Sequence, residues 1–330
     1  MSEPMTLRLV RSAPELGQTQ SGSAWSSATT RPLTRVRWAG SLRYCGRVLD
    51  RVGFADMLTD VIDLSDAIYA ANRGQPTELS TAAQEVEQFD LELEAATGPP
   101  APLFGAYADA EGKARALNDL VCSAATLLAR DDTNVGYVNA LRAAMETAAR
   151  LYWVLAPDGG HLDRAGRFIR ERLRSISEVS KFNAETRTVM SMIKAELIAG
   201  ADRAGITVPS APAALDLIAD LVTRPGVLNL RGIDREEAGA MFYRLPSAPT
   251  HAAVHGIALH HADPNQDSTG RRTTPEPWEH TLVVGAGLYA GYTTTHRALL
   301  LLYGWDATDW DRHVRAAAQR IAGALAAERQ

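Results

Sequence analysis

The chain has 330 residues, of which 46% are hydrophobic, 22% charged and 6% aromatic. This length and apolar content suffice for one large domain or two modest ones, and the composition is typical of a soluble, helix-rich protein. The net charge of −5 excludes a global positive field of the kind that holds a long nucleic acid, but it leaves room for a local basic patch.

The N-terminal residues, up to about position 40, predict a mobile arm. They are rich in Ser, Thr and Arg and lack the apolar core of a secretory signal peptide. A basic arm that touches a phosphate is the alternative interpretation. The chain holds two cysteines, Cys45 and Cys122, and no CxxC pair. We therefore expect buried, reduced thiols and a cytoplasmic protein.

Helical periodicity dominates the rest of the chain, and no convincing alternating strand is present. The spacing of apolar residues predicts a first helix over residues 43–72. The acidic stretch 74–105 predicts a surface excursion with a short helix inside it. Two clear helices are expected next, over 111–132 and 134–156, and Pro157 ends the second one.

The second half of the chain predicts a series of helices separated by proline, glycine and polar breaks. The long apolar run 161–204 changes stripe at a break or cap near Asn183. Shorter helices are expected after Pro212 and from Asp234, where an acidic first turn suits the helix macrodipole. The remaining helices are expected over residues 251–261, 279–303 and 307–328.

Together these elements predict an all-α fold, a multi-helix bundle in which the long helices run antiparallel. We divide the chain into three parts from this pattern. They are the mobile arm, 1–40, an N-terminal helical region with the acidic loop, 41–110, and the main helical bundle, 111–330.

One apolar segment, TLVVGAGLYAGYTTTHRALLLLYGW (residues 281–305), is long enough to span a bilayer. The polar and charged groups from Thr293 to Arg297 interrupt its middle, so we expect a buried core helix and no membrane contact. Its glycines resemble a dinucleotide-binding fingerprint only superficially, because no strand precedes them, and we expect them to allow close helix packing. These glycines are Gly285, Gly287 and Gly291.

Half of the chain's eight histidines fall within YRLPSAPTHAAVHGIALHH, residues 243–261. His251 and His255 are four residues apart, so on a helix they share a face, as the zinc ligands of HExxH proteins do. Here Ala-Ala-Val stands between them, without the glutamate that acts as the base in those proteins. A third ligand would have to come from elsewhere in the chain, and we expect neither a metal nor another cofactor.

Arg244 and His251 are separated by six residues. This arrangement resembles the arginine–histidine signature of the HEPN superfamily, small all-helical domains that include metal-independent ribonucleases. The resemblance implies that His251 transfers a proton at the 2′-hydroxyl or the leaving 5′-oxygen of RNA. It implies that Arg244 stabilises the phosphorane-like transition state. It also implies a homodimer, because such sites are typically completed across two copies.

A second constellation lies on the predicted helix 134–156, where Arg142, Glu146 and Arg150 are spaced by four residues. HEPN domains often carry an acidic residue four positions before a basic one, and Glu146 with Arg150 resembles that pair. The resemblance places Glu146 and Arg150 among the catalytic residues and Arg142 among the substrate-binding ones. An exposed charge ladder, worth a few tenths of a kcal/mol, is the alternative interpretation.

From about residue 115 to residue 300 the chain is similar to a group of uncharacterised actinobacterial all-helical proteins. The segment that carries this similarity has the pattern Tyr-Arg-x-x-Ser-x-x-x-His, which here is Tyr243, Arg244, Ser247 and His251. We expect Tyr243, Ser247 and His255 to contact the substrate.

His296 is a further candidate for substrate binding, with a hydrogen-bonded core histidine as the alternative. The arginine-rich run DRAGRFIRERLR, residues 163–174, predicts a basic face of ordinary solvated side chains. That face would support binding of an RNA backbone if it lay beside Arg244.

Three functions therefore remain open from the sequence. The first is a HEPN-like ribonuclease of the toxin or defence type, with RNA as its partner. The second is a small-molecule enzyme or binding protein of specialised metabolism, with an anionic ligand in a pocket between helices. The third is a non-catalytic interaction module in which the histidines only form hydrogen bonds within the bundle.

Overall fold

The computed structural model describes residues 49–98, 101–130, 136–155, 157–224, 234–244 and 278–327. Within these ranges the chain forms ten α-helices and one short π-helix, and it contains no strand. The predicted all-α fold is therefore confirmed. The predicted N-terminal arm and the predicted helix 251–261 lie outside the described residues, and the proposed domain boundaries stay a prediction.

The described part begins with two helices, α1 (Arg51–Ala71) and α2 (Thr81–Thr97). The prediction of a surface excursion over residues 74–105 is wrong, because α2 is a full helix that packs against α3 and α6. Two of its acidic side chains, Glu85 and Asp90, are buried. The acidic composition suggested a solvated loop, but these two carboxylates accept hydrogen bonds from other helices.

The centre of the fold is a pair of long helices, α3 (Pro102–Leu128) and α4 (Gly136–Leu155). The helix α3 begins nine residues earlier than the predicted start at residue 111. Its first backbone N–H groups need acceptors, and the Asp90 carboxylate accepts from Leu103 N–H at 2.8 Å and from Phe104 N–H at 2.6 Å. The expectation of buried thiols is wrong for Cys122, which is exposed on α3.

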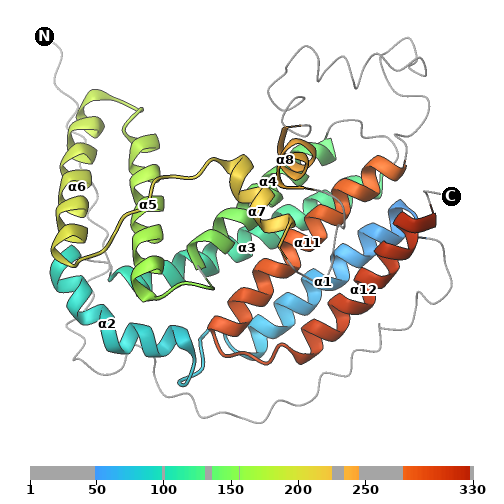
Figure 1. Cartoon of the computed structure of the whole chain (residues 1–330), viewed down its shortest axis with the longest axis horizontal. Coiled ribbons are helices and arrows are strands. Elements are labelled where there is room, and N and C mark those ends of the chain that lie inside the picture. The colour runs from blue at the N-terminus through green and yellow to red at the C-terminus, as the bar shows by residue number, and fades with distance from the viewer. Residues whose placement is uncertain are drawn as a thin grey trace, which may run out of the picture. The chain divides into compact units, whose positions relative to one another are not determined.

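The next two helices, α5 (His161–Val179) and α6 (Ala184–Arg203), form a hairpin. The predicted break at Asn183 is confirmed, because its side chain accepts a hydrogen bond from Thr186 N–H at 2.7 Å and caps α6. Figure 1 shows the turn of this hairpin away from the other labelled helices.

The arginines of α5 are not the solvated basic face that the sequence predicts. Arg164 is buried and ion-paired with Glu85. Of the other four, Arg172 lies over the Phe168 ring, with its guanidinium carbon 5.8 Å from the ring centre, and the remaining three each donate a hydrogen bond to another residue of the chain. Arg167 donates to the Trp153 carbonyl at 2.8 Å, Arg170 to the Pro209 carbonyl at 2.5 Å and Arg174 to Glu171 at 3.0 Å.

The remaining elements are two short helices, one π-helix and two long helices. The π-helix η1 continues directly from α8 and ends at Arg244. The long helices α11 and α12 lie beside α1 (Figure 1). The bounds are α7, Ala214–Val222; α8, Arg235–Gly239; η1, Ala240–Arg244; α11, Trp278–Leu302; and α12, Thr308–Ala327.

The glycines of α11 allow close packing, as predicted. A Cβ atom built on Gly287 would lie 2.2 Å from a ring carbon of Phe242 on η1, and one on Gly285 would lie 2.6 Å from a ring carbon of Phe54 on α1. These glycines let two aromatic rings reach the helix backbone. In the described part of the chain, no helix combines the length and the apolarity needed to cross a membrane.

Candidate functional site

The structure brings two of the predicted site residues together across the chain. Arg142 lies on α4 and Tyr243 on η1, and the guanidinium carbon of Arg142 lies 5.2 Å from the centre of the Tyr243 ring. A cation at this distance from an aromatic face is attracted by the ring quadrupole, whose face carries partial negative charge. The segment that contains Arg244 therefore starts beside the α4 charge ladder.

The Arg142 side chain has binding capacity that the described residues do not use. Its Nε atom is buried without a hydrogen-bond partner among them. No ion pair joins Arg142 to a carboxylate within the described ranges, Glu146 included. A buried guanidinium N–H without an acceptor is costly, so an acceptor that enters the site would relieve this cost.

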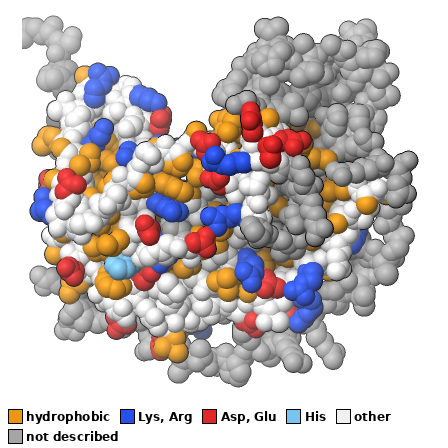
Figure 2. All heavy atoms as spheres, in the orientation of Figure 1, with side chains coloured by type: hydrophobic (Ala, Val, Ile, Leu, Met, Phe, Trp, Pro, Cys, Tyr) orange, Lys and Arg blue, Asp and Glu red, His pale blue; other side chains and the backbone are white. Residues whose placement is uncertain are grey.

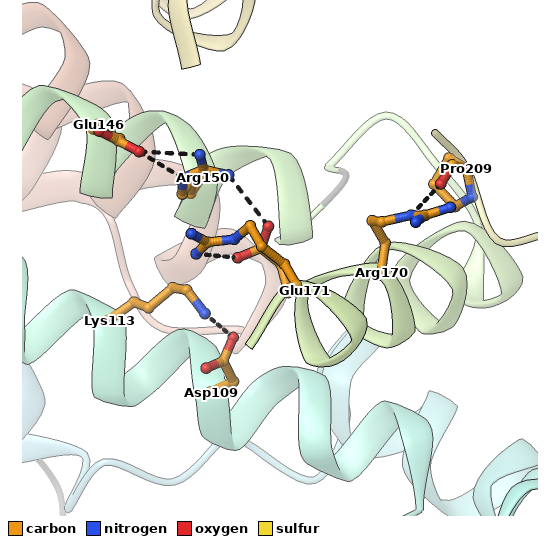
Figure 3. A network of polar contacts seen from close by, with 8 residues as sticks. Asp109, Lys113, Glu146, Arg150, Arg170, Glu171 and Pro209 are labelled. Atoms are coloured by element: carbon orange, nitrogen blue, oxygen red, sulfur yellow. Dashed lines mark hydrogen bonds and ion pairs between the residues drawn. The ribbon is translucent and has the colours of Figure 1, made fainter. Parts of the chain in front are cut away.

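Glu146 and Arg150 form the ion pair predicted from their spacing, and the pair is part of a larger network (Figure 3). Arg150 Nε lies 3.0 Å from Glu146 Oε1, and Arg150 Nη1 lies 3.4 Å from Oε1 of Glu171 on α5. Glu171 Oε2 in turn accepts from Arg174 at 3.0 Å. The side chains of Arg150 and Glu171 are only 13% and 7% exposed. An exposed ladder is therefore not the right description, because the network joins α4 to α5.

Two further arginine–aromatic contacts follow at the C-terminal end of α4. The guanidinium carbon of Arg224 lies 4.9 Å from the Tyr152 ring centre, and that of Arg167 lies 5.6 Å from the Trp153 ring centre. Arg224 also donates to the Tyr152 hydroxyl at 3.0 Å and to Asp158 at 2.5 Å. Burial raises the pKa of the Tyr152 hydroxyl, so it stays protonated at neutral pH.

The sequence did not single out Arg224, Arg167 or Glu171 as neighbours of α4. The aromatic pair at positions 152 and 153 was the only available signal for the first two. Glu171 carried none, because it stands among arginines on a different helix.

His296 lies in the core and apart from this network. It is 1% exposed, and its Nδ1 atom lies 3.2 Å from the Ser65 hydroxyl of α1. Its ring contacts Tyr292 and Trp310 at centroid distances of 4.3 and 5.6 Å. Burial lowers the pKa of His296 to about 3. These contacts are those of a hydrogen-bonded core histidine, and they give no support to substrate binding by His296.

Four predicted residues cannot be placed in the same detail. The backbone of Arg244 ends η1, but its side chain lies outside the described residues. Ser247, His251 and His255 also lie outside them. Among the residues that the structure describes, no group of three or more His, Cys, Asp or Glu side chains is arranged to hold a metal ion.

Comparison of the chain with protein-family models, with curated proteins and with solved structures found no match.

Proposed function

We propose that the protein is a HEPN-like, metal-independent ribonuclease, in which Arg244 and His251 act on the scissile phosphodiester. One observation carries the proposal. The ring of Tyr243, the residue before Arg244, lies 5.2 Å from the guanidinium carbon of Arg142, whose Nε atom is buried without a partner among the described residues. The residue just before the Arg244–His251 segment thus lies beside a guanidinium group that can bind an anion.

The charges around Arg142 support an anionic substrate. Glu146 is already paired with Arg150, and Glu171 is shared by Arg150 and Arg174. The neighbouring carboxylates are therefore compensated, and Arg142 adds a positive charge that no carboxylate of the described residues pairs with. A planar guanidinium donates two parallel hydrogen bonds to a phosphate, which holds the backbone of RNA in one orientation.

The chemistry assigned to the segment requires no metal. The 2′-oxygen attacks the adjacent phosphorus, the bond from phosphorus to the 5′-oxygen breaks, and a 2′,3′-cyclic phosphate and a 5′-hydroxyl result. An imidazole ordinarily titrates near neutrality, so His251 would take the proton from the 2′-hydroxyl or deliver one to the leaving oxygen. Arg244 would stabilise the extra negative charge on the phosphorus oxygens.

Cleavage of single-stranded RNA in the presence of EDTA tests the proposal. The expected products carry a 2′,3′-cyclic phosphate and a 5′-hydroxyl, and EDTA leaves the rate unchanged. Deoxyribonucleotide oligomers of the same sequence serve as the matched control, because they lack the attacking 2′-hydroxyl and should remain intact. Cleavage that EDTA abolishes, or equal cleavage of the DNA control, would contradict the assignment.

A further inference from the structure

The outer part of the α5–α6 hairpin lacks a packing partner within the described residues. Between Arg174 and Glu196 no side chain is buried, and within the described ranges the main contacts of α6 are with α5 and α2. Yet this part carries several large apolar side chains that are exposed, and Figure 2 shows hydrophobic side chains gathered over the two helices. These side chains, with their exposed fractions, are Val179, 39%; Phe182, 80%; Val189, 48%; Met192, 70%; and Ile193, 39%.

Phe182 stands at the turn of the hairpin, just before the Asn183 cap. An aromatic side chain left in water forfeits about 1.5–3 kcal/mol of burial free energy. The turn itself does not require an aromatic residue at position 182, because the side chain of Asn183 supplies the capping hydrogen bond. Phe182 therefore has no packing partner among the described residues, and an exposed aromatic side chain of this kind can anchor a protein–protein contact.

A groove lies on the same hairpin, where α5 and α6 face α3. It has a volume of about 280 Å³. Its apolar lining is formed by Phe168, Ile176, Met190 and Ile193, and charged side chains of both signs also line it. Two of these charged side chains, Asp109 and Lys113, are paired with each other (Figure 3). A groove of this size and lining can accept an aromatic ring.

We propose that this hairpin is the interface of a symmetric dimer, in which Phe182 of each copy enters the groove of the other. The two features lie on one hairpin, so a two-fold axis generates both contacts at once, as an isologous interface requires. The proposal does not depend on any ribonuclease activity.

The charge of the hairpin favours a second copy over a partner with strong charge. From Arg174 to Glu196 it carries four basic and three acidic residues, and the two signs are interspersed. Nucleic acid or a strongly acidic peptide would be attracted by a single-sign surface, which this is not. Interspersed charges suit a copy of the same surface, because each sign can face its opposite across the two-fold axis.

The exposed apolar area matches what a dimer needs. The five side chains are on average about half exposed, so together they offer roughly 500 Å² of apolar surface per copy. Apolar atoms make up a little over half of an ordinary interface. The hairpin can therefore support about 800 Å² per partner, which is the standard size for a stable complex.

Sedimentation velocity of the full chain at micromolar concentration tests the proposal. The wild-type protein should sediment as two chains. Phe182→Ala should raise the dissociation constant at least about 30-fold, because the substitution removes an anchor from both symmetric contacts. Leu91→Ala is the matched control, since Leu91 is 84% exposed but lies on α2. It should leave the dissociation constant unchanged, and circular dichroism should show that each variant is folded.

A mixing experiment separates the Phe-in-groove contact from a general loss of apolar surface. Ile193→Glu places a charge in the groove and should also produce single chains. An equal mixture of Phe182→Ala and Ile193→Glu should recover part of the dimer, because one intact Phe182 then meets one intact groove. Single chains in the wild type, an unchanged dissociation constant in Phe182→Ala, or no recovery in the mixture would each overturn the proposal.

Discussion

Arg142 and Tyr243 are separated in the chain by α5, α6, α7 and α8, yet the guanidinium carbon of the first lies 5.2 Å from the ring centre of the second. The contact joins the charge ladder of α4 to the segment that leads into Arg244 and His251. The sequence alone does not connect the Arg142–Glu146–Arg150 spacing with the Arg244–His251 spacing, and this contact brings the first beside the start of the second.

Arg142→Gln should weaken binding of single-stranded RNA about tenfold, because a charge-assisted contact to a phosphate is lost. The slope of log affinity against log salt should also fall by about 0.7, the value for one phosphate contact on a single strand. Fluorescence anisotropy over a salt series measures both quantities. Arg115→Gln, in an exposed pair with Glu111 on α3, should change neither. An unaltered slope in Arg142→Gln would show that this guanidinium does not meet the backbone.

Gly287→Ala should destabilise the fold and disturb the site, because the added Cβ would lie 2.2 Å from the Phe242 ring and would displace η1. A cost of about 1–3 kcal/mol is typical of such overpacking. Gly323→Ala is the control, since its Cβ would meet nothing within 4 Å on α12. It should stabilise the helix by about 0.5–1 kcal/mol. Urea unfolding measures the change in the free energy of unfolding for both variants. Equal changes for Gly287→Ala and Gly323→Ala would contradict the close packing of α11 against Phe242.

Glu85→Gln should cost about 3–5 kcal/mol of unfolding free energy, because it breaks a buried ion pair from one side. Glu85 accepts from Arg164 Nε at 2.8 Å and from the Tyr107 hydroxyl at 2.7 Å, so it ties α2 to α5 and α3. Glu178→Gln offers the matched change in an exposed pair with Lys181. That variant should lose far less stability than Glu85→Gln, because solvent screens an exposed ion pair. Denaturant titration measures the free energy of unfolding of both variants. Similar decreases would contradict the conclusion that Glu85 links α2 to α3 and α5.

His296 should make the fold less stable in acid. Its folded pKa is about 3 because the ring is buried, whereas an unfolded histidine titrates near pH 6.5. Between these values the unfolded chain binds more protons, so the free energy of unfolding falls as the pH is lowered from about 6.5 towards 3. The change is at most about 1.4 kcal/mol per pH unit.

The stability difference between the wild type and His296→Asn isolates this contribution from other titrating groups, among them His313, whose pKa burial also lowers. Urea unfolding at pH values from 7 to 4 should show that the difference shrinks as the pH falls. A difference that stays constant over this range would mean that the imidazole is not held neutral in the core.

Local signals predicted much of the fold. The apolar stripes located α4, α5, α6, α11 and α12 to within a few residues, and Asn183 marked the turn between α5 and α6 because its side chain caps a helix. The sequence-based prediction was wrong where charged side chains are buried and paired with residues far away in the chain. Glu85 made α2 resemble a solvated loop, and Arg164 made α5 resemble a basic face, although the two pair with each other.

The candidate site was predictable only in part. The Glu146–Arg150 pair follows from spacing on one helix, so the sequence could anticipate it. The contact of Arg142 with Tyr243, and that of Arg150 with Glu171, depend on how helices far apart in the chain pack. No periodicity encodes such contacts. Burial of His296 likewise depends on contacts with α1 and α12, two helices that lie far apart in the sequence.

The rate of RNA cleavage by His251→Ala, measured beside the wild type under single turnover in EDTA, tests the central claim most directly. The account predicts that the variant loses at least about a hundredfold in rate, while its free energy of unfolding stays within about 0.5 kcal/mol of the wild-type value. A wild-type protein that leaves RNA intact, or a His251→Ala variant that cleaves as fast as the wild type, would contradict it.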